Sequence, residues 1–533
     1  MAAYDLEGEE PGAGARRTGA PRQGARRDAG AAEASVPLVV DLDGALIATD
    51  TLHESLAALA ARGAPEFLGA LWQALAAWRR GGGAAGGGGA AGGGRAACSG
   101  RAAFKAAIAD RVIPDAALLP VRPEALALIE EARAQGRPVL LVTAADRRVA
   151  EAVAAVHPGL FDEVHGSDGA RNLGGAEKAA FLEERFGRGG FDYLGDAPRD
   201  LPVWRAARRA ITIAAPPRLR AQAEAAAPEG ARHLAPPARG LAALTPWLKA
   251  MRPHQWAKNL LVFLPVLAAH RADWGAWQAS LLAFLAFSLT ASAVYLLNDL
   301  LDLEADRRHP RKRRRPFASG AIPLAGGALL GAGLLGAGMA LAASVSALLL
   351  GVLAFYFGAT LLYSLVLKRE LVIDICVLAG LYTLRVIAGS AAVELRPSPW
   401  MLALSTFLFL ALAAMKRQTE LVDLAASGRV AASGRAYRAE DLPVVTMMAI
   451  AGGYTAVLIL ALYIYSPGVA ALYKSPLILW GAPPILLYWV SRMVMIAHRG
   501  GMEDDPVLFA IRDRVSLACG AGVAAVGLAA WTL

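Results

Sequence analysis

Hydrophobic and polar positions follow different patterns in the two halves of the chain. From residue 36 to about residue 236, apolar runs of strand length alternate with Ala-rich amphipathic segments. The runs are 36–42, 139–142 and 191–194, and one amphipathic segment is 123–135. Strands that alternate with helices indicate a parallel sheet covered by helices. We therefore predict an α/β domain over residues 36–232.

Long uncharged stretches begin after residue 251. Those without any charged side chain are 274–298, 316–367, 397–415 and 442–473. A membrane-spanning helix needs about 20 mostly apolar residues, so 316–367 must hold two. Further apolar runs lie near Leu260, Leu371, Pro476 and Val507. The pattern predicts an all-α membrane domain of nine transmembrane helices over residues 248–533, after a linker at 233–247.

Basic residues concentrate on alternate loops between the predicted spans. They form the clusters 307–315, 416–438 and 492–499, together with Lys368 and Arg369. The opposite loops hold little more than Arg271, Arg396 and Lys474. Cytoplasmic loops carry the excess of Lys and Arg. We therefore expect a multi-pass protein of the inner (plasma) membrane, with its α/β domain and active sites in the cytoplasm.

Composition supports the membrane interpretation. Of the 533 residues, 56% are hydrophobic and only 19% are charged, with a net charge of +9. In so apolar a chain, this excess fits loops facing an anionic leaflet better than a nucleic-acid partner. Three scattered cysteines exclude a disulfide framework. Residues 1–35 lack an apolar signal region, and we predict a disordered tail there. The Gly-rich run 81–94 is predicted to be a flexible loop.

Two carboxylates follow the first predicted strand. Asp41 and Asp43 precede Gly44, and residues at this spacing in a strand point the same way. One can attack a phosphorus atom while the other handles the proton of the leaving group, although such residues are also common in turns. Thr143 ends the second apolar strand and Lys178 opens a helix. Both would lie at the ligand-binding edge of the sheet.

The last part of this motif is the acidic segment 195–200, which contains Asp196 and Asp200. The order and spacing of the whole set resemble the haloacid dehalogenase (HAD) superfamily of phosphatases, which have a Rossmann-like fold. The resemblance implies a phosphatase domain over residues 36–232, with a small helical cap over about residues 50–118. A domain kept only for docking is the alternative.

The resemblance also implies roles for these residues. Asp41 would be the nucleophile that forms an aspartyl-phosphate, and Asp43 the general acid/base. Thr143 and Lys178 would hold the phosphoryl group. One Mg²⁺ would be bound by Asp41, by the carbonyl of Asp43 and by Asp196, with Asp200 supporting the site.

A second acidic motif closes the span at 274–298. Asn298, Asp302 and Asp306 are four residues apart and share a helix face about 12 Å long, with Asp299 beside them. Carboxylates at the mouth of a spanning helix are costly unless a cation or a water-filled cavity accepts them. We predict that these four residues bind Mg²⁺ carrying a diphosphate, a solvated helix end being the alternative.

Polar residues at the same predicted membrane face complete a candidate substrate site. They are Lys258, Asn259, Arg315, Tyr363, Lys368, Arg385 and Lys416. An unpaired cation within a span is costly, so buried Arg385 is a candidate for function. Asp374 is the simplest partner for it.

The segments 252–259, 298–316 and 363–368 resemble the UbiA-type membrane prenyltransferase superfamily, over roughly residues 248–533. Within it, they resemble the decaprenyl-phosphate phosphoribosyltransferase branch. Aromatic prenyltransferases carry a second Asp-rich motif, where this chain has Tyr363 and Lys368. The resemblance implies phosphoribosyl pyrophosphate and a polyprenyl phosphate as substrates, with at least one Mg²⁺ in the membrane site and Asp302 as a catalytic residue.

Together, the two resemblances predict a bifunctional membrane enzyme. The membrane domain would transfer 5-phosphoribose to polyprenyl phosphate and release pyrophosphate. The HAD-like domain would then remove the 5-phosphate, giving polyprenyl-phosphoryl ribose, a precursor of lipid-linked ribose or arabinose for cell-envelope glycans. The alternatives are an aromatic prenyltransferase with a phosphatase for a separate small phosphate ester, and a transporter or membrane anchor. Membrane lipids are expected partners, nucleic acid is not, and homo-oligomerisation stays open.

Overall fold

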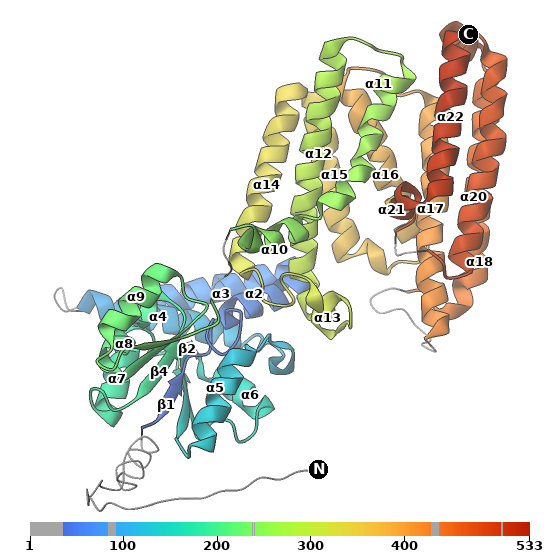
Figure 1. Cartoon of the computed structure of the whole chain (residues 1–533). Helices are drawn as coiled ribbons and strands as arrows, with labels where there is room; N and C mark the ends of the chain where they lie inside the picture. Colours follow the sequence, from blue (N-terminus) through green and yellow to red (C-terminus); the bar gives the residue numbers. More distant parts are fainter. Residues whose placement is uncertain (1–35, 84–91, 237, 239, 428–435, 503–504) are drawn as a thin grey trace, which may run out of the picture. The chain divides into compact units, whose positions relative to one another are not determined.

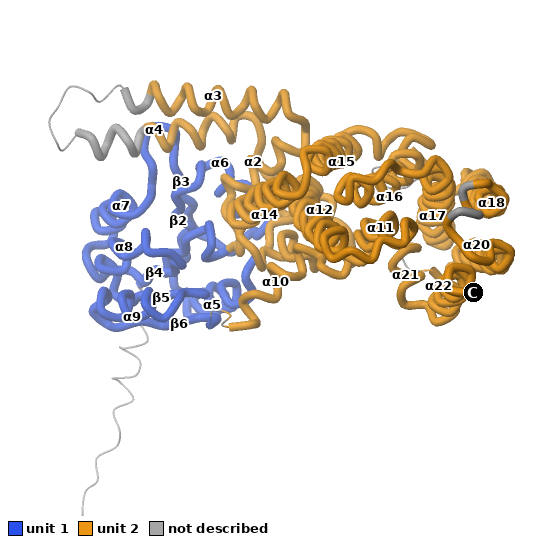
Figure 2. Tube along the Cα trace, turned by 90° about the horizontal axis from the view of Figure 1, so that it is seen from above, with its two compact units in different colours: residues 1–46, 121–236 blue, residues 47–120, 237–533 orange. Residues whose placement is uncertain are grey.

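The structure, a computed structural model, describes residues 36–83, 92–236, 238, 240–427, 436–502 and 505–533. The predicted tail at 1–35 and the middle of the Gly-rich run lie outside the described residues. The chain forms two compact units (Figure 2). Unit 1 takes the chain up to Leu46 together with Val121–Pro236, and unit 2 takes Ile47–Pro120 together with Pro237–Leu533.

Unit 1 is built on a parallel sheet of six strands in the order β3-β2-β1-β4-β5-β6. The strands are β1 Leu38–Val40, β2 Val139–Asp146, β3 Glu163–Ser167, β4 Asp192–Gly195, β5 Arg209–Ile213 and β6 Ala231–Leu234. Val40 of β1 pairs with Leu141 of β2 on one side and with Leu194 of β4 on the other. The predicted α/β fold is confirmed, and the strand order reverses beside β1.

Helices between the strands cover the sheet (Figure 1). They are α5 Pro123–Ala134, α6 Arg147–Val156, α7 Ala176–Phe186, α8 Leu201–Ala206 and α9 Pro217–Ala226. One apolar cluster joins Val39 and Leu140 of the strands to Leu182 of α7 and Trp204 of α8, all buried. Burial of this apolar surface fixes the strands that lead into the polar motifs.

Unit 2 begins with three helices that lie in the sequence between β1 and β2. They are α2 Thr51–Arg62, α3 Ala64–Gly83 and α4 Gly92–Ala109. Asp50 caps α2 by accepting hydrogen bonds from the backbone N–H groups of Leu52 and His53. The three helices pack around buried Leu59, Ala74 and Ile108.

The rest of unit 2 contains eight helices that are long and apolar enough to cross a membrane, among the residues described. They are α12 Trp274–Leu301, α14 Leu324–Val345, α15 Ala347–Leu365, α16 Ile373–Ala392, α17 Pro399–Ala426, α18 Leu442–Ile464, α20 Ala482–His498 and α22 Arg514–Thr532. Two of them are extended by short 3₁₀ segments, α18 by Ala439–Asp441 and α20 by Pro476–Gly481.

The structure thus has eight such helices rather than the predicted nine. The apolar segment near Leu260 is divided into α10 Leu241–Met251, a 3₁₀ stretch at Pro253–Phe263 and the short α11 Leu264–Ala268. Arg252 adopts a left-handed conformation with φ of 52° between the first two. Pro253 and Pro265 each lack the N–H that a continuous helix would use.

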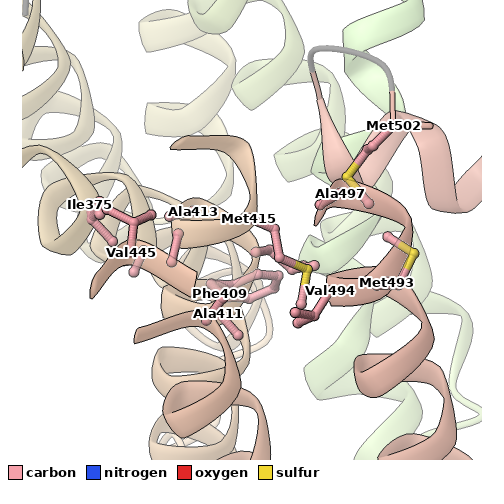
Figure 3. Packing of buried hydrophobic residues seen from close by; sticks show 14 of the residues in the cluster. Ile375, Phe409, Ala411, Ala413, Met415, Val445, Met493, Val494, Ala497 and Met502 are labelled. Atoms are coloured by element: carbon pink, nitrogen blue, oxygen red, sulfur yellow. The ribbon is translucent and has the colours of Figure 1, made fainter. Parts of the chain in front are cut away.

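Consecutive spans run in opposite directions, so alternate connections lie at the same end of the bundle (Figure 1). At one end, α13 Leu303–Arg308 follows α12 (Figure 1). The 3₁₀ turn Leu367–Arg369 after α15 lies at the same end, because Lys368 contacts Asp302. The 3₁₀ turn Lys312–Arg314 follows α13, and α21 Pro506–Arg512 follows α20. Of the predicted basic clusters, residues 307–315 and Lys368 lie at this end, whereas Lys416 lies within α17 and Arg492 within α20. Deeper in the bundle, Phe409 and Met415 of α17 pack with Val445 of α18 and Met493 of α20 (Figure 3).

A buried charge cluster ties together the strand starts in unit 1. The Asp192 carboxylate, only 1% exposed, accepts hydrogen bonds from Arg137 at 2.5 Å and from Arg208 at 2.7 and 2.9 Å. Removing one partner of a buried ion pair leaves an uncompensated charge.

Asp192→Asn is expected to lower the free energy of unfolding of unit 1 by about 3 kcal/mol. Thermal unfolding of the full chain, followed by hydrogen exchange of residues 136–213, measures this loss. In the control Glu131→Gln, the exposed pair with Arg232 is lost, and the change should stay below about 1 kcal/mol. Equal effects of the two substitutions would refute the prediction.

Candidate active sites

The first candidate site lies where β1 and β4 end side by side. Asp41 follows Val40 and Asp196 follows Gly195, on strands that are paired in the sheet. Gly44 makes the approach of the two loops feasible, because a Cβ at its position would lie 2.1 Å from Asp196 Oδ2. Gly44 also has a φ of 81°, which favours glycine.

A continuous chain of polar contacts connects three of the predicted residues. Lys178 Nζ lies 2.9 Å from Asp41 Oδ1 and donates a hydrogen bond of 2.7 Å to the Tyr193 hydroxyl. That hydroxyl donates to Asp200 Oδ1 at 3.0 Å. The Lys178 side chain is only 1% exposed, so its charge is compensated within this network.

The structure supports a metal site at this position. Ligand oxygens of Asp41, Asp196 and Asp200 lie within 4.8 Å of one another, and no other group of three His, Cys, Asp or Glu side chains does so in the described part of the chain. Asp196 Oδ1 is buried without a hydrogen-bond partner. Burial, together with Asp200 and Asp41, raises the pKa of Asp196 to about 7. Hard oxygen ligands with excess negative charge fit Mg²⁺.

Asp43 and Thr143 border this site without joining the three carboxylates. The Asp43 side chain is 7% exposed, and its backbone carbonyl accepts a hydrogen bond from Arg199 Nη2 at 3.4 Å. Thr143 is fully buried, and its Oγ1 accepts a hydrogen bond from the Ala145 N–H at 3.1 Å. The hydroxyl of Thr143 keeps its own proton to donate to a ligand.

The second candidate site lies in unit 2, where α12 ends. Asp299 Oδ1 accepts hydrogen bonds from Arg252 at 2.6 Å and from Arg315 at 3.2 Å. Arg315 also donates to Asp306 Oδ2 at 2.7 Å. Arg315 therefore holds Asp299 of α12 and Asp306 of α13 together.

Asp302 points to a different partner. Its Oδ1 accepts a hydrogen bond of 3.0 Å from Lys368, which lies in the connection between α15 and α16. Asp299, Asp302 and Asp306 do not gather three ligand atoms in one place among the residues described. The donor types at this helix end, including the amide of Asn298, still suit a hard cation. Each carboxylate here is paired with a basic side chain.

Predicted basic residues within the bundle are also paired. Lys258 donates a hydrogen bond to Asp505, the residue that caps α21. Arg385 donates to Asn259 Oδ1 at 2.9 Å and to the Tyr356 hydroxyl at 3.2 Å. The guanidinium of Arg385 also lies within about 5.2 Å of the rings of Phe287, Tyr356 and Tyr382, a favourable arrangement for a cation.

The expected pairing of Asp374 with Arg385 was wrong. Asp374, which is fully buried, accepts hydrogen bonds of 2.6 Å from Arg417 and from the Tyr437 hydroxyl. Arg417 also donates to the Tyr363 hydroxyl at 3.3 Å. Tyr363 is thus close to the charges at the end of α17, next to the half-buried Lys416.

Several polar residues of the two sites were missed from the sequence. Tyr193 lies within an apolar strand, and Arg252, although part of a quoted segment, was not assigned to the site. Arg417 follows Lys416 in the basic cluster 416–438, which we used to infer which loops face the cytoplasm. Arg252 and Arg417 each lie next to a long uncharged run, and this position could have identified them as site residues.

Two family models match the chain. The model of the UbiA prenyltransferase family matches residues 259–512. The model of the haloacid dehalogenase-like hydrolase matches residues 38–205. The second match contains the whole Asp41 site, and the first contains the membrane site from Asn259 onward, without Arg252 and Lys258. The resemblances predicted from the motifs are confirmed.

Individual proteins are similar over different parts of the chain. Protein y4nM of Sinorhizobium fredii is 34% identical over 491 residues, which are 92% of this chain and 90% of the relative. The nodulation protein NoeC of Azorhizobium caulinodans is 38% identical over 280 residues, 52% of this chain and 91% of the relative. The decaprenyl-phosphate phosphoribosyltransferase of Mycobacterium tuberculosis is 39% identical over 191 residues, 35% of this chain and 62% of the relative.

Asp196→Asn is expected to weaken Mg²⁺ binding in unit 1 by more than about tenfold, because it removes a ligand with an unpartnered buried oxygen. Isothermal titration calorimetry of the full chain in nanodiscs measures this. Asp168→Asn changes an exposed carboxylate on a neighbouring loop and should leave the titration unaltered. An unchanged isotherm for Asp196→Asn would exclude this residue as a ligand.

Proposed function

Because the chain belongs to the UbiA prenyltransferase family and carries a haloacid dehalogenase-like hydrolase domain, we propose that it makes a lipid-linked ribose in two steps. The membrane domain transfers 5-phosphoribose from phosphoribosyl pyrophosphate to a polyprenyl phosphate. The hydrolase domain then removes the 5-phosphate. The product, polyprenyl-phosphoryl ribose, would serve cell-envelope glycan synthesis on the cytoplasmic side of the inner membrane.

The observation that carries the proposal is the salt bridge between Asp302 and Lys368. Lys368 stands where an aromatic prenyltransferase would carry its second Asp-rich motif. With Arg252 and Arg315 bound to Asp299, three basic side chains face one acidic helix end. A site with one acidic cluster and several cations suits a pyrophosphate donor together with a second phosphate. The similarity to the named phosphoribosyltransferases supports the same substrates.

In the first step, a phosphate oxygen of the lipid attacks the anomeric carbon of the ribose. A carbon–oxygen bond forms, and the bond to pyrophosphate breaks with its electron pair on the leaving oxygen. The lipid phosphate is anionic at neutral pH, so no general base is required. Arg315 and Lys368 exchange their carboxylate partners for the oxygens of the departing group. Once these basic side chains have left them, Asn298, Asp299, Asp302 and Asp306 would hold Mg²⁺, which would supply further positive charge.

In the second step, the Asp41 carboxylate attacks the 5-phosphate. Asp43 gives its proton to the ribose oxygen as the phosphorus–oxygen bond breaks, and later takes a proton from the water that hydrolyses the aspartyl-phosphate. Lys178 and Thr143 hold the phosphoryl oxygens. Asp41, Asp196, Asp200 and the carbonyl of Asp43 would hold Mg²⁺, which would supply positive charge beside these oxygens.

An apolar groove offers a place for the isoprenoid tail. It has a volume of about 480 Å³ and lies between α20 and α22, lined by Pro484, Ile485, Tyr488, Val515, Ala518, Cys519 and Gly522. Between two membrane spans, such a groove would be open to the bilayer.

Asp302→Asn is expected to lower kcat for transfer by at least about 100-fold, because it removes a carboxylate proposed to hold the Mg²⁺ that stabilises the departing pyrophosphate. Transfer of radiolabelled ribose from phosphoribosyl pyrophosphate to polyprenyl phosphate measures it. Glu304→Gln, on the exposed side of α13, is the matched control and should stay within about twofold. If wild-type protein instead consumed a prenyl diphosphate and an aromatic acceptor, the alternative enzyme class would replace this one.

Asp41→Asn is expected to stop the sequence at the 5-phosphorylated lipid, because the nucleophile is lost while transfer is intact. Mass spectrometry of the lipid products distinguishes this species from phosphate-free polyprenyl-phosphoryl ribose. Asp168→Asn should give the wild-type product. Absence of the phosphorylated intermediate in Asp41→Asn would separate the hydrolase domain from this lipid.

A further inference from the structure

A buried ion pair within unit 2 joins α2 to α13. Arg307 Nη1 and Nη2 donate hydrogen bonds to the two carboxylate oxygens of Glu54 at 2.8 and 2.7 Å. The side chains are 6% and 3% exposed. This is the bidentate geometry in which a guanidinium and a carboxylate interact most strongly.

The remaining polar atoms of this pair are also bonded. Thr49 Oγ1 donates to Glu54 Oε1 at 2.6 Å, and Arg307 Nε donates to the Ala318 carbonyl at 3.0 Å. A second ion pair, between Arg308 and Asp115 at 3.2 Å, lies nearby. Its side chains are 60% and 40% exposed, respectively. The buried pair is therefore the specific element of the contact, because exposed ion pairs contribute little.

The partner of Glu54 lies inside the acidic motif of the membrane site. Arg307 directly follows Asp306 in the sequence. Arg315 Nη1 donates one hydrogen bond to Asp306 and another to Asp299. Through the Ala318 carbonyl, Arg307 also holds the far end of the loop that carries Arg315. One guanidinium thus fixes both ends of the segment 307–318 against α2.

The helix within this segment is too short to be stable by itself. Helix α13 has only six residues, and a helix of this length is not stable without tertiary contacts. Arg308, the last residue of α13, is exposed and therefore does not anchor the helix. Apolar anchoring comes from Leu303 and from Phe317 and Ala318, which pack with Leu296 and with Ala57 of α2. Helix α2 therefore supplies both an apolar contact and the charge that Arg307 needs.

We propose that Glu54, in the helical insertion of the hydrolase domain, is a positioning residue of the transferase site. It holds Arg307, and thereby keeps Asp306 and Arg315 placed for the pyrophosphate donor. The effect of Glu54 on catalysis rests on the proposed function, whereas its effect on the order of residues 303–318 does not. The two parts are tested by separate measurements.

The structural part is tested by hydrogen exchange of the ligand-free full chain in nanodiscs. Glu54→Gln leaves Arg307 buried without a counter-charge, so exchange at residues 303–318 should rise at least about fivefold, while residues 274–298 stay unchanged. Asp115→Asn, at the exposed pair, is the control and should change neither segment. Unchanged exchange at 303–318 in Glu54→Gln would overturn the proposal.

The catalytic part is tested by steady-state kinetics of transfer. Glu54→Gln should raise KM for phosphoribosyl pyrophosphate about tenfold and change kcat less than about threefold, because the groups that act on the donor are present but misplaced. The double variant Glu54→Gln/Arg307→Gln should lose no more than either single variant, since both remove one interaction. Additive losses would overturn the proposal, as would a loss in kcat alone. If the wild type transfers no ribose, the proposed function fails and the exchange result alone decides the structural part.

Discussion

Burial of carboxylates next to a source of positive charge is the constraint on which both sites depend. A carboxylate removed from water is costly unless a cation or hydrogen bonds replace its hydration. In unit 1, Lys178 compensates only part of the charge of Asp41, Asp196 and Asp200, and Asp196 keeps a buried oxygen without a partner. The remaining negative charge favours a divalent cation. The α/β fold provides this arrangement because β1 and β4 end together.

The membrane site meets the same constraint in a different way. Its carboxylates are compensated by basic side chains from other parts of unit 2, namely Arg252 and Arg315 for Asp299 and Lys368 for Asp302. These pairs keep the free site neutral at the end of a span, where an uncompensated charge would be expensive. In the proposed function, the same cations would pass to phosphate oxygens when a donor binds.

The sequence predicted which polar residues gather at each site better than how they pair. Asp41, Lys178 and Asp200 follow from strand ends and a helix start, because parallel strands meet at one edge. Tyr193 connects Lys178 with Asp200, but it lies within a buried apolar strand, where the sequence does not distinguish it from a core residue. The partner of Asp374 depends on how α16 and α17 pack, which spacing along one helix does not determine. The ninth span was expected from apolar composition alone, whereas Arg252 and two prolines divide that segment.

The insertion between β1 and β2 gives the chain a connection that two separate enzymes would lack. Its residues 47–120 group with the membrane helices, while the strands on either side of it belong to unit 1. The same insertion carries Glu54, which neutralises Arg307 in the acidic segment of the transferase. A loss of the insertion would therefore remove more than a hydrolase cap, because it would leave a buried guanidinium beside Asp306 without its partner. In the proposed arrangement, the order of residues 303–318 in the membrane domain depends on α2, a helix inserted between two strands of the hydrolase domain.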